Sequence, residues 1–171
     1  MTEILSNSIN DIKHAAEIIL QGGVVAIPTD TLYGLAALND QQVANIKGRS
    51  LKEKPISWLV NIIPTTFSSE NKKIAELFWP GALTIIDKGI GYRKSDDYIS
   101  QKIIELVRQP ITGTSANLTN QTSNTTAAGV LLQLEGKIDA IVVDDSLPKG
   151  MASTVVQDGK ILRQGAIYID L

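Results

Sequence analysis

The spacing of apolar residues along the 171-residue chain predicts helices and strands that mostly alternate. Apolar side chains recur every third or fourth position over 11–21, which predicts a helix with Ser8 or Asn10 as its cap and Gly22 at its end. The β-branched run over 24–27 then predicts a short buried strand. The chain therefore begins with a helix followed by a strand.

Similar patterns predict the remaining elements. We expect a helix that is capped by Asn39 and runs to about Lys47, and further helices over 69–78, 96–108 and 125–134. We also expect strands over 57–62, 82–87 and 138–143, and an extended segment over 111–116. Near the end, Asp158-Gly159 separates two short β-branched runs and predicts a hairpin of 154–157 with 160–163, followed by a last strand over 167–169. Because strands and helices alternate, we predict one α/β domain over 1–171, with helices packed on a mixed sheet.

Composition and charge narrow the chemistry that this domain can perform. The chain has no cysteine and a single histidine, His14, so a thiol nucleophile, a thiolate metal site and a multi-histidine zinc site are excluded or hard to build. The formal net charge of -2 gives no global basic field that would recruit nucleic acid. Neither a signal peptide nor an apolar run of the roughly 18 residues of a membrane span is found, so we expect a cytoplasmic protein.

The clearest local concentration of charge is Lys47-Gly48-Arg49, with Lys52 and Lys54 close behind. Gly48 follows a predicted helix end, so the chain leaves the helix there and can point Lys47 and Arg49 the same way. Lysine and the arginine fork suit phosphate oxygens. Local charge alone, however, favours a solvated basic loop over a phosphate site.

Two polar segments follow predicted strands. Thr114-Ser115-Ala116-Asn117 combines small residues with hydroxyl and amide groups, and the polar run after it leads to a helix N-terminus whose N–H groups could hold an anion. A turn followed by a helix cap explains the same residues equally well. Pro28-Thr29-Asp30-Thr31 stands at a strand end, where ligands of α/β sheets gather, although an Asx turn is the simpler interpretation.

Taken in order, these segments resemble the threonylcarbamoyl-AMP synthase family, the TsaC or YrdC-like proteins. The resemblance covers nearly the whole chain, from Gly22 to Ile167, and it rests on the stretches GGVVAIPTDTLYGLAA, IKGR, KPISWLV, FWPGALT, TSANLT, STVV and ILRQGAI. The paired K-x-R and S-x-N signatures are specific when they occur together with the others.

The resemblance implies a YrdC-like open twisted mixed sheet with flanking helices around a concave positive cavity. It also implies a nucleotidyltransferase that forms L-threonylcarbamoyladenylate and pyrophosphate from L-threonine, bicarbonate and ATP, with Mg²⁺ as the candidate metal cofactor. Partner proteins of the TsaD, TsaB and TsaE type then transfer the threonylcarbamoyl group to a tRNA adenosine. Such chemistry needs positioning and charge neutralisation rather than a protein nucleophile.

The resemblance also implies roles for individual residues. It places Lys47, Arg49, Ser115 and Asn117 at the catalytic centre. The expected ATP contacts are Lys47, Arg49, Lys54, Ser115, Asn117, Ser123 and Arg163. The expected threonine contacts are Thr29, Thr31, Arg93 and Ser153. No protein-held metal is expected.

A different class of function stays open from sequence alone. The segment Tyr92–Asp97 departs from the V-R-x-P-x-H pattern of the family around its arginine. The alternative is therefore a YrdC-fold protein that binds nucleotide or double-stranded RNA without synthase activity. Binding of L-threonine discriminates between the two hypotheses.

Overall fold

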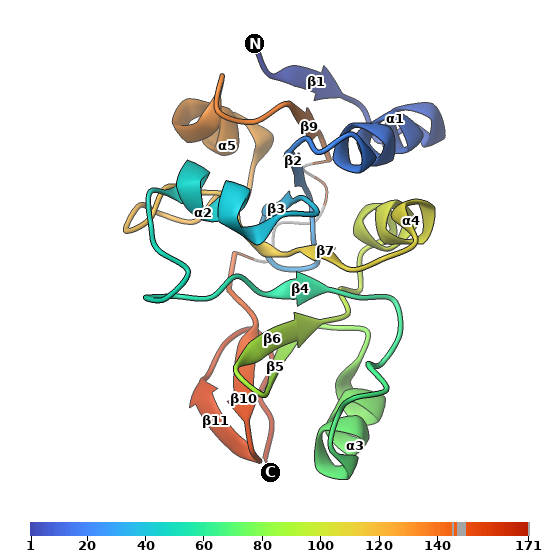
Figure 1. The fold of residues 1–171 in the computed structure, drawn as a ribbon, viewed down its shortest axis with the longest axis vertical. Helices are drawn as coiled ribbons and strands as arrows, with labels where there is room; N and C mark the ends of the chain where they lie inside the picture. The colour runs from blue at the N-terminus through green and yellow to red at the C-terminus, as the bar shows by residue number, and fades with distance from the viewer. Residues whose placement is uncertain (145, 147–149, 171) are drawn as a thin grey trace.

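The computed structural model describes residues 1–144, 146 and 150–170. Over these residues the strands form two mixed sheets, one of five strands and one of six, with helices against them (Figure 1). The expected mixed α/β class is confirmed, although the strands divide into two sheets instead of one.

The five-stranded sheet has the order β1-β9-β2-β3-β8. Its strands are β1 (Glu3–Leu5), β9 (Ala140–Val142), β2 (Val25–Ile27), β3 (Gly34–Ala36) and β8 (Thr114–Ser115). β9 pairs in parallel with both β1 and β2, whereas β3 pairs antiparallel with β2 and β8. The sheet is therefore mixed, with its antiparallel part at the β8 edge.

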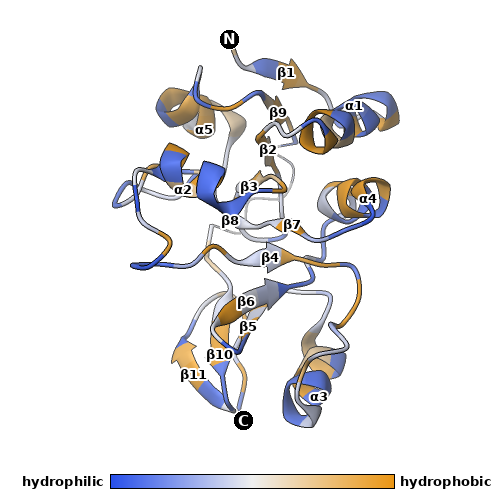
Figure 2. Ribbon diagram, viewed as in Figure 1, coloured by the Kyte–Doolittle hydropathy of each residue, from blue (hydrophilic) through white to orange (hydrophobic). Residues whose placement is uncertain are grey.

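Helices cover both faces of this sheet. Helices α1 (Ile9–Leu20) and α4 (Tyr98–Val107) pack with Val25 and Ile27, while α2 (Asp40–Lys47) and α5 (Ala127–Leu134) share a core with Ala26 on the other face. Because successive strand residues point to opposite faces, a strand covered on both sides must be apolar throughout. In Figure 2, β2 and β9 are accordingly hydrophobic, whereas α1 and α4 carry both hydrophobic and hydrophilic residues.

The six-stranded sheet has the order β11-β10-β5-β6-β4-β7. Its strands are β11 (Lys160–Arg163), β10 (Thr154–Gln157), β5 (Leu83–Asp87), β6 (Ile90–Arg93), β4 (Trp58–Leu59) and β7 (Ile111–Thr112). Helix α3 (Ser69–Phe78) packs on it through Ile74, against Leu83, Ile85 and Val156. The predicted hairpin of 154–157 with 160–163 is confirmed.

The chain passes from one sheet to the other at Gly113. This residue lies between β7 of the six-stranded sheet and β8 of the five-stranded sheet, and its N–H donates to the Ser57 carbonyl at 2.7 Å. A Cβ at this position would lie 2.4 Å from Leu59 Cγ, so only glycine allows this close approach. The two sheets are therefore joined tightly beside the Thr114–Asn117 segment.

The sequence patterns did not predict three strands, which are β1, β3 and β6. β1 is a short edge strand, and Gly34-Leu35-Ala36 of β3 is buried throughout without alternation or β-branching. β6 follows β5 through a tight turn in which Lys88 and Gly89 both have positive φ. Short strands of this kind gain their stability from neighbouring strands rather than from their own propensity.

The predicted last strand over 167–169 is wrong. Ile169 is buried, as a strand residue would be, but the segment is irregular. Its Ile167 carbonyl accepts hydrogen bonds from the side chains of Thr154 and Gln164 instead of from a strand partner. The apolar residues therefore indicated correctly that Ile169 is buried, but they predicted a strand where the backbone is irregular.

Candidate functional site

A cavity of about 540 Å³ lies where the two sheets meet, a size within the roughly 300–1,000 Å³ of small-molecule sites. Both sheets and the loops that leave them contribute to its wall. All eleven residues that the sequence assigns to the site line it: Thr29, Thr31, Lys47, Arg49, Lys54, Arg93, Ser115, Asn117, Ser123, Ser153 and Arg163. Segments up to 134 residues apart in sequence are thus brought together, although the role of each residue stays a prediction.

The wall of the cavity is cationic. Lys47, Arg49, Lys54, Arg93 and Arg163 line it, and among the described residues no aspartate or glutamate does. This contrasts with the formal net charge of -2 for the whole chain. Such a concave site concentrates positive potential and selects anionic ligands.

Lys47 occupies the last position of α2, where the local sequence fixes its direction. The Asn39 side chain caps the start of the helix, and Gly48 ends it in the left-handed conformation with φ of 68°. The Lys47 ammonium then donates to the Ser115 carbonyl at 2.6 Å and to the Asn117 carbonyl at 2.7 Å. The lysine therefore ties the end of α2 to the S-x-N segment.

Burial lowers the pKa of Lys47 from 10.5 to about 7, and repulsion from Arg49 and Lys54 acts in the same direction. The side chain is only 3% exposed, so its charge is poorly solvated. An anion placed in the cavity would relieve this repulsion and favour the protonated form. Lys47 therefore loses its proton readily in the ligand-free protein and regains it when an anion binds nearby.

This lowered pKa makes stability depend on pH with a definite sign. Between pH 7 and 10.5 the unfolded chain binds a proton at Lys47 that the folded chain does not, so the free energy of unfolding rises with pH in that window. We expect the free energy of unfolding of the wild type to increase relative to that of Lys47→Met by at most about 1.4 kcal/mol per pH unit from pH 7 to 9. Lys47→Met also loses the hydrogen bonds of Lys47, but this loss changes the free energy of unfolding by an amount that does not rise with pH in this way.

Urea unfolding at pH 6, 7, 8 and 9 measures this difference. Lys52→Met, at an exposed lysine of the following loop, is the matched control. A wild-type minus Lys47→Met difference that is flat from pH 7 to 9, or that falls, contradicts the lowered pKa.

The S-x-N segment is fixed by its own amide. The Asn117 side chain donates from Nδ2 to the carbonyls of Leu118 and Gln121, both at 2.8 Å. Asn124 donates from Nδ2 to the Ala116 carbonyl at 2.6 Å. These bonds close the loop over 117–124 on itself, so that Ser115, Asn117 and Ser123 all border the cavity.

The proposal that the next helix N-terminus holds the anion is not supported by its position. The cap of α5 is Thr126, the second residue of the helix predicted over 125–134, and its side chain accepts from Gly129 N. Within the described residues, neither Thr126 nor the first turn of α5 lines the cavity. The hydroxyl and amide side chains of the loop face the ligand space instead.

Three cations stand on the side of the cavity near the K-x-R loop. Repulsion from Arg49 and from Arg163 adds to burial in lowering the pKa of Lys54, which shows that the three charges act on one another. Arg163 Nη2 donates to the Ser153 carbonyl at 2.8 Å, and Arg49 Nε is buried with no hydrogen-bond partner. None of the three forms an ion pair within the described residues, so their charge is available to a ligand.

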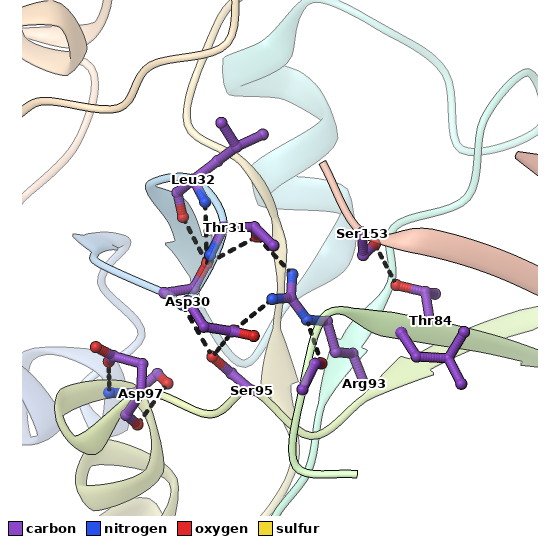
Figure 3. A network of polar contacts seen from close by, with 12 residues as sticks. Asp30, Thr31, Leu32, Thr84, Arg93, Ser95, Asp97 and Ser153 are labelled. Carbon is purple, nitrogen blue, oxygen red and sulfur yellow. Dashed lines mark hydrogen bonds and ion pairs between the residues drawn. The ribbon is translucent and has the colours of Figure 1, made fainter. Parts of the chain in front are cut away.

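A second polar cluster is built around Arg93 (Figure 3). The Arg93 guanidinium, at the end of β6, donates from Nη1 to Thr31 Oγ1 at 2.7 Å and pairs through Nη2 with the Asp30 carboxylate. Thr29 and Thr31 are joined through their hydroxyls at 3.1 Å. Burial lowers the pKa of Arg93, while the charge of Asp30 opposes that shift.

Sequence reasoning assigned no role to three residues of this cluster. Asp30 and Ser95 contact Arg93 or each other, and Thr84 shares a hydrogen bond of 2.8 Å between its hydroxyl and that of Ser153. Asp30 stands inside P-T-D-T, so the motif itself was a signal. Thr84 ends the stretch FWPGALT and Ser95 lies in the segment Tyr92–Asp97, but neither stretch indicated the contacts, because the partners are distant in sequence.

The described residues contain no candidate metal site and no helix that could span a membrane. In the described ranges, no group of three or more histidine, cysteine, aspartate or glutamate side chains could hold a metal ion. Across the same ranges, every helix is too short or too polar to cross a membrane.

Comparison with known proteins identifies the same group of proteins through sequence and through structure. A family model described as "Telomere recombination", which covers the Sua5, YciO and YrdC proteins, matches residues 17–165. The threonylcarbamoyl-AMP synthase of Pyrococcus abyssi is 32% identical over 169 residues, which span 85% of this chain and 50% of that protein. The chain thus spans about half the length of this curated relative.

Solved structures share the fold. P. abyssi Sua5 complexed with L-threonine superimposes with a TM-score of 0.83 at 28% identity, over 96% of this chain and 57% of that one. Escherichia coli YciO superimposes with a TM-score of 0.82 at 20% identity, over 96% of each chain. With a family match over most of its length, this chain belongs to the Sua5/YciO/YrdC family.

Proposed function

We propose that this protein is a threonylcarbamoyl-AMP synthase, which converts L-threonine, bicarbonate and ATP into L-threonylcarbamoyladenylate, pyrophosphate and water. The observation that carries the proposal is the single cavity in which K-x-R, S-x-N, P-T-D-T and Arg93 meet without any carboxylate in the described wall. The similarity to a curated threonylcarbamoyl-AMP synthase supports it. Both sheets line the cavity, so we propose that 1–171 works as one domain.

The K-x-R side of the cavity is assigned to ATP. Arg49, Lys54 and Arg163 carry charge that no described acid neutralises, which suits the triphosphate. Lys47 anchors the S-x-N segment and adds a fourth positive charge when an anion restores its proton. Ser115 and Ser123 offer hydroxyl groups to the nucleotide without adding charge, and Asn117, which we also assign to this side, holds the loop in place through its amide.

The Arg93 side is assigned to L-threonine. Thr29, Thr31 and Ser153 surround the guanidinium with hydroxyl groups, which can orient an amino acid that itself carries a hydroxyl. P. abyssi Sua5, 28% identical to this chain, has been solved in complex with L-threonine. We propose that the α-carboxylate meets Arg93 and that the amino group points toward the ATP side.

The chemistry then proceeds without a protein nucleophile. The threonine amine attacks the carbon of bicarbonate or carbon dioxide, and the carbamate oxygen attacks the α-phosphorus as pyrophosphate leaves. Arg49, Lys54 and Arg163 neutralise charge that develops on the phosphates, and the walls of the cavity hold the reacting groups together. The cavity wall offers no described carboxylate for Mg²⁺, so that ion would arrive bound to the phosphates of ATP.

The wider role follows from the product. A threonylcarbamoyl-adenylate is an activated acyl donor, so a partner of the TsaD, TsaB or TsaE type would transfer the group to a tRNA adenosine in the cytoplasm. We propose no direct RNA binding for this step, because the formal net charge of -2 gives no general attraction for RNA.

Release of pyrophosphate tests the proposal. We expect purified protein with Mg²⁺ to release it only when L-threonine, bicarbonate and ATP are all present, and calorimetry to detect L-threonine binding. L-2-Aminobutyrate, which is L-threonine without its hydroxyl, is the matched control. Correctly folded protein that binds nucleotide but neither binds L-threonine nor releases pyrophosphate would instead be the nucleotide-binding or RNA-binding member of the family.

A further inference from the structure

The guanidinium of Arg93 is held from three directions. Its Nε donates to the Gly81 carbonyl at 3.2 Å, Nη1 donates to Thr31 Oγ1 at 2.7 Å, and Nη2 pairs with Asp30 Oδ1. The same Asp30 oxygen accepts a hydrogen bond from the Ser95 hydroxyl. Figure 3 shows the Asp30, Thr31 and Ser95 side chains converging on one end of the arginine.

This arrangement leaves a defined part of the arginine available. A guanidinium has five N–H groups, and the three bonds above use one on each nitrogen. One N–H therefore remains on Nη1 and one on Nη2. An N–H group on each Nη atom can donate to a carboxylate oxygen, and Arg93 lines the cavity.

Asp30 is the only charged group among these partners. It follows β2 of the five-stranded sheet, whereas Arg93 ends β6 of the six-stranded sheet, so the ion pair spans the joint between the sheets. Both side chains are buried, with Asp30 4% and Arg93 8% exposed. Ser95, which is fully buried, accepts from Asp30 N and donates to Asp30 Oδ1, and so holds the carboxylate in one orientation.

We propose that Asp30 is a positioning residue: with Ser95, it orients the Arg93 guanidinium so that its two remaining N–H groups meet the α-carboxylate of the amino-acid substrate. This inference rests on the proposed function. Asp30 does not line the cavity itself, so it acts through Arg93 and not on the substrate. The selectivity of the protein for a free carboxylate then depends on Asp30, which lies behind Arg93 and outside the cavity wall.

Asp30→Asn removes the charge while keeping an oxygen that can accept from Arg93 and Ser95. We expect the KM for L-threonine to rise about tenfold, which corresponds to about 1.4 kcal/mol, with the KM for ATP and kcat changed less than twofold. We also expect the preference of the protein for L-threonine over L-threoninamide, measured by calorimetry, to fall by a similar factor. Ser95→Ala, which keeps the ion pair, gives a smaller change in the same direction.

Asp97→Asn is the matched control, because Asp97 is also a buried acid nearby but caps α4 through Ser100 without contacting Arg93. We expect it to leave the KM for L-threonine unchanged. The proposal is overturned if Asp30→Asn binds L-threonine as the wild type does. It is equally overturned if L-threonine and L-threoninamide weaken by the same factor, which is the behaviour of a purely structural ion pair.

The positioning role can be measured apart from the synthase reaction. In ¹⁵N NMR spectra of the ligand-free protein, a fixed Arg93 guanidinium gives separate Nη–H signals because rotation about its C–N bonds is slow. We expect these signals in the wild type and their averaging in Asp30→Asn. If the wild type shows them but binds no L-threonine, the proposed function fails. If they persist in Asp30→Asn, the positioning role fails.

Discussion

Replacing Arg49 with alanine is expected to lower the rate of pyrophosphate release by at least about a hundredfold, as loss of a charged group that stabilises a transition state does. Arg49 lines the cavity, forms no ion pair within the described residues, and has a buried Nε without a partner. The neighbouring cations Lys54 and Arg163 keep their charge in this variant, but neither reproduces the position of the Arg49 guanidinium. Arg49→Lys keeps the charge but loses the two-pronged geometry, so we expect only partial activity.

The measurement is steady-state pyrophosphate release, with circular dichroism to show that each variant is folded. Lys52→Ala, at an exposed residue of the same loop, is the control and should retain full activity. Lys47→Ala is expected to remove activity as well, because it releases the S-x-N segment in addition to a charge. An Arg49→Ala rate within twofold of the wild type would refute the assignment of this arginine to the phosphates.

Replacing Arg93 with alanine is expected to cost about 3–5 kcal/mol in the free energy of unfolding and to abolish L-threonine binding. The variant leaves the Asp30 carboxylate buried and unpaired between the two sheets. The cost comes mainly from this orphaned charge, since burying an unpaired ion is unfavourable. Urea unfolding at pH 8 measures it.

The double variant Asp30→Asn with Arg93→Ala separates charge from packing. We expect it to recover part of the lost stability, because asparagine leaves no charge behind, while L-threonine binding stays absent. Equal stability of the single and double variants would show that the ion pair contributes little and that the loss arises from packing around Arg93.

These expectations distinguish two sides of one cavity. Arg49, Lys54 and Arg163 are held apart from acids, so their charge is free for a polyanion. Arg93 is paired with Asp30, so its remaining capacity suits the single carboxylate of an amino acid. The difference lies in which cation has a carboxylate partner, and it agrees with the assignment of ATP to one side and L-threonine to the other.

Local sequence determined the elements whose signal lies within a few residues. The apolar stripes of α1 and α4, the Asn39 cap and the Gly48 end of α2 all act between near neighbours, and each was predictable. The hairpin at Asp158-Gly159 is of the same kind. The motifs likewise predicted which residues would line the site, because K-x-R, S-x-N and P-T-D-T each occupy a short continuous segment.

Tertiary structure alone decided how those residues work together. The division into two sheets depends on Gly113 passing beside Leu59, and the strand β3 depends on the backbones of its neighbours. The pairing of Asp30 with Arg93 joins positions 63 residues apart, and the contact of Lys47 with Ser115 joins positions 68 apart. Charge alone suggested a solvated loop at Lys47. Burial, which only the assembled fold creates, is what lowers its pKa and makes Lys47 part of the cavity wall.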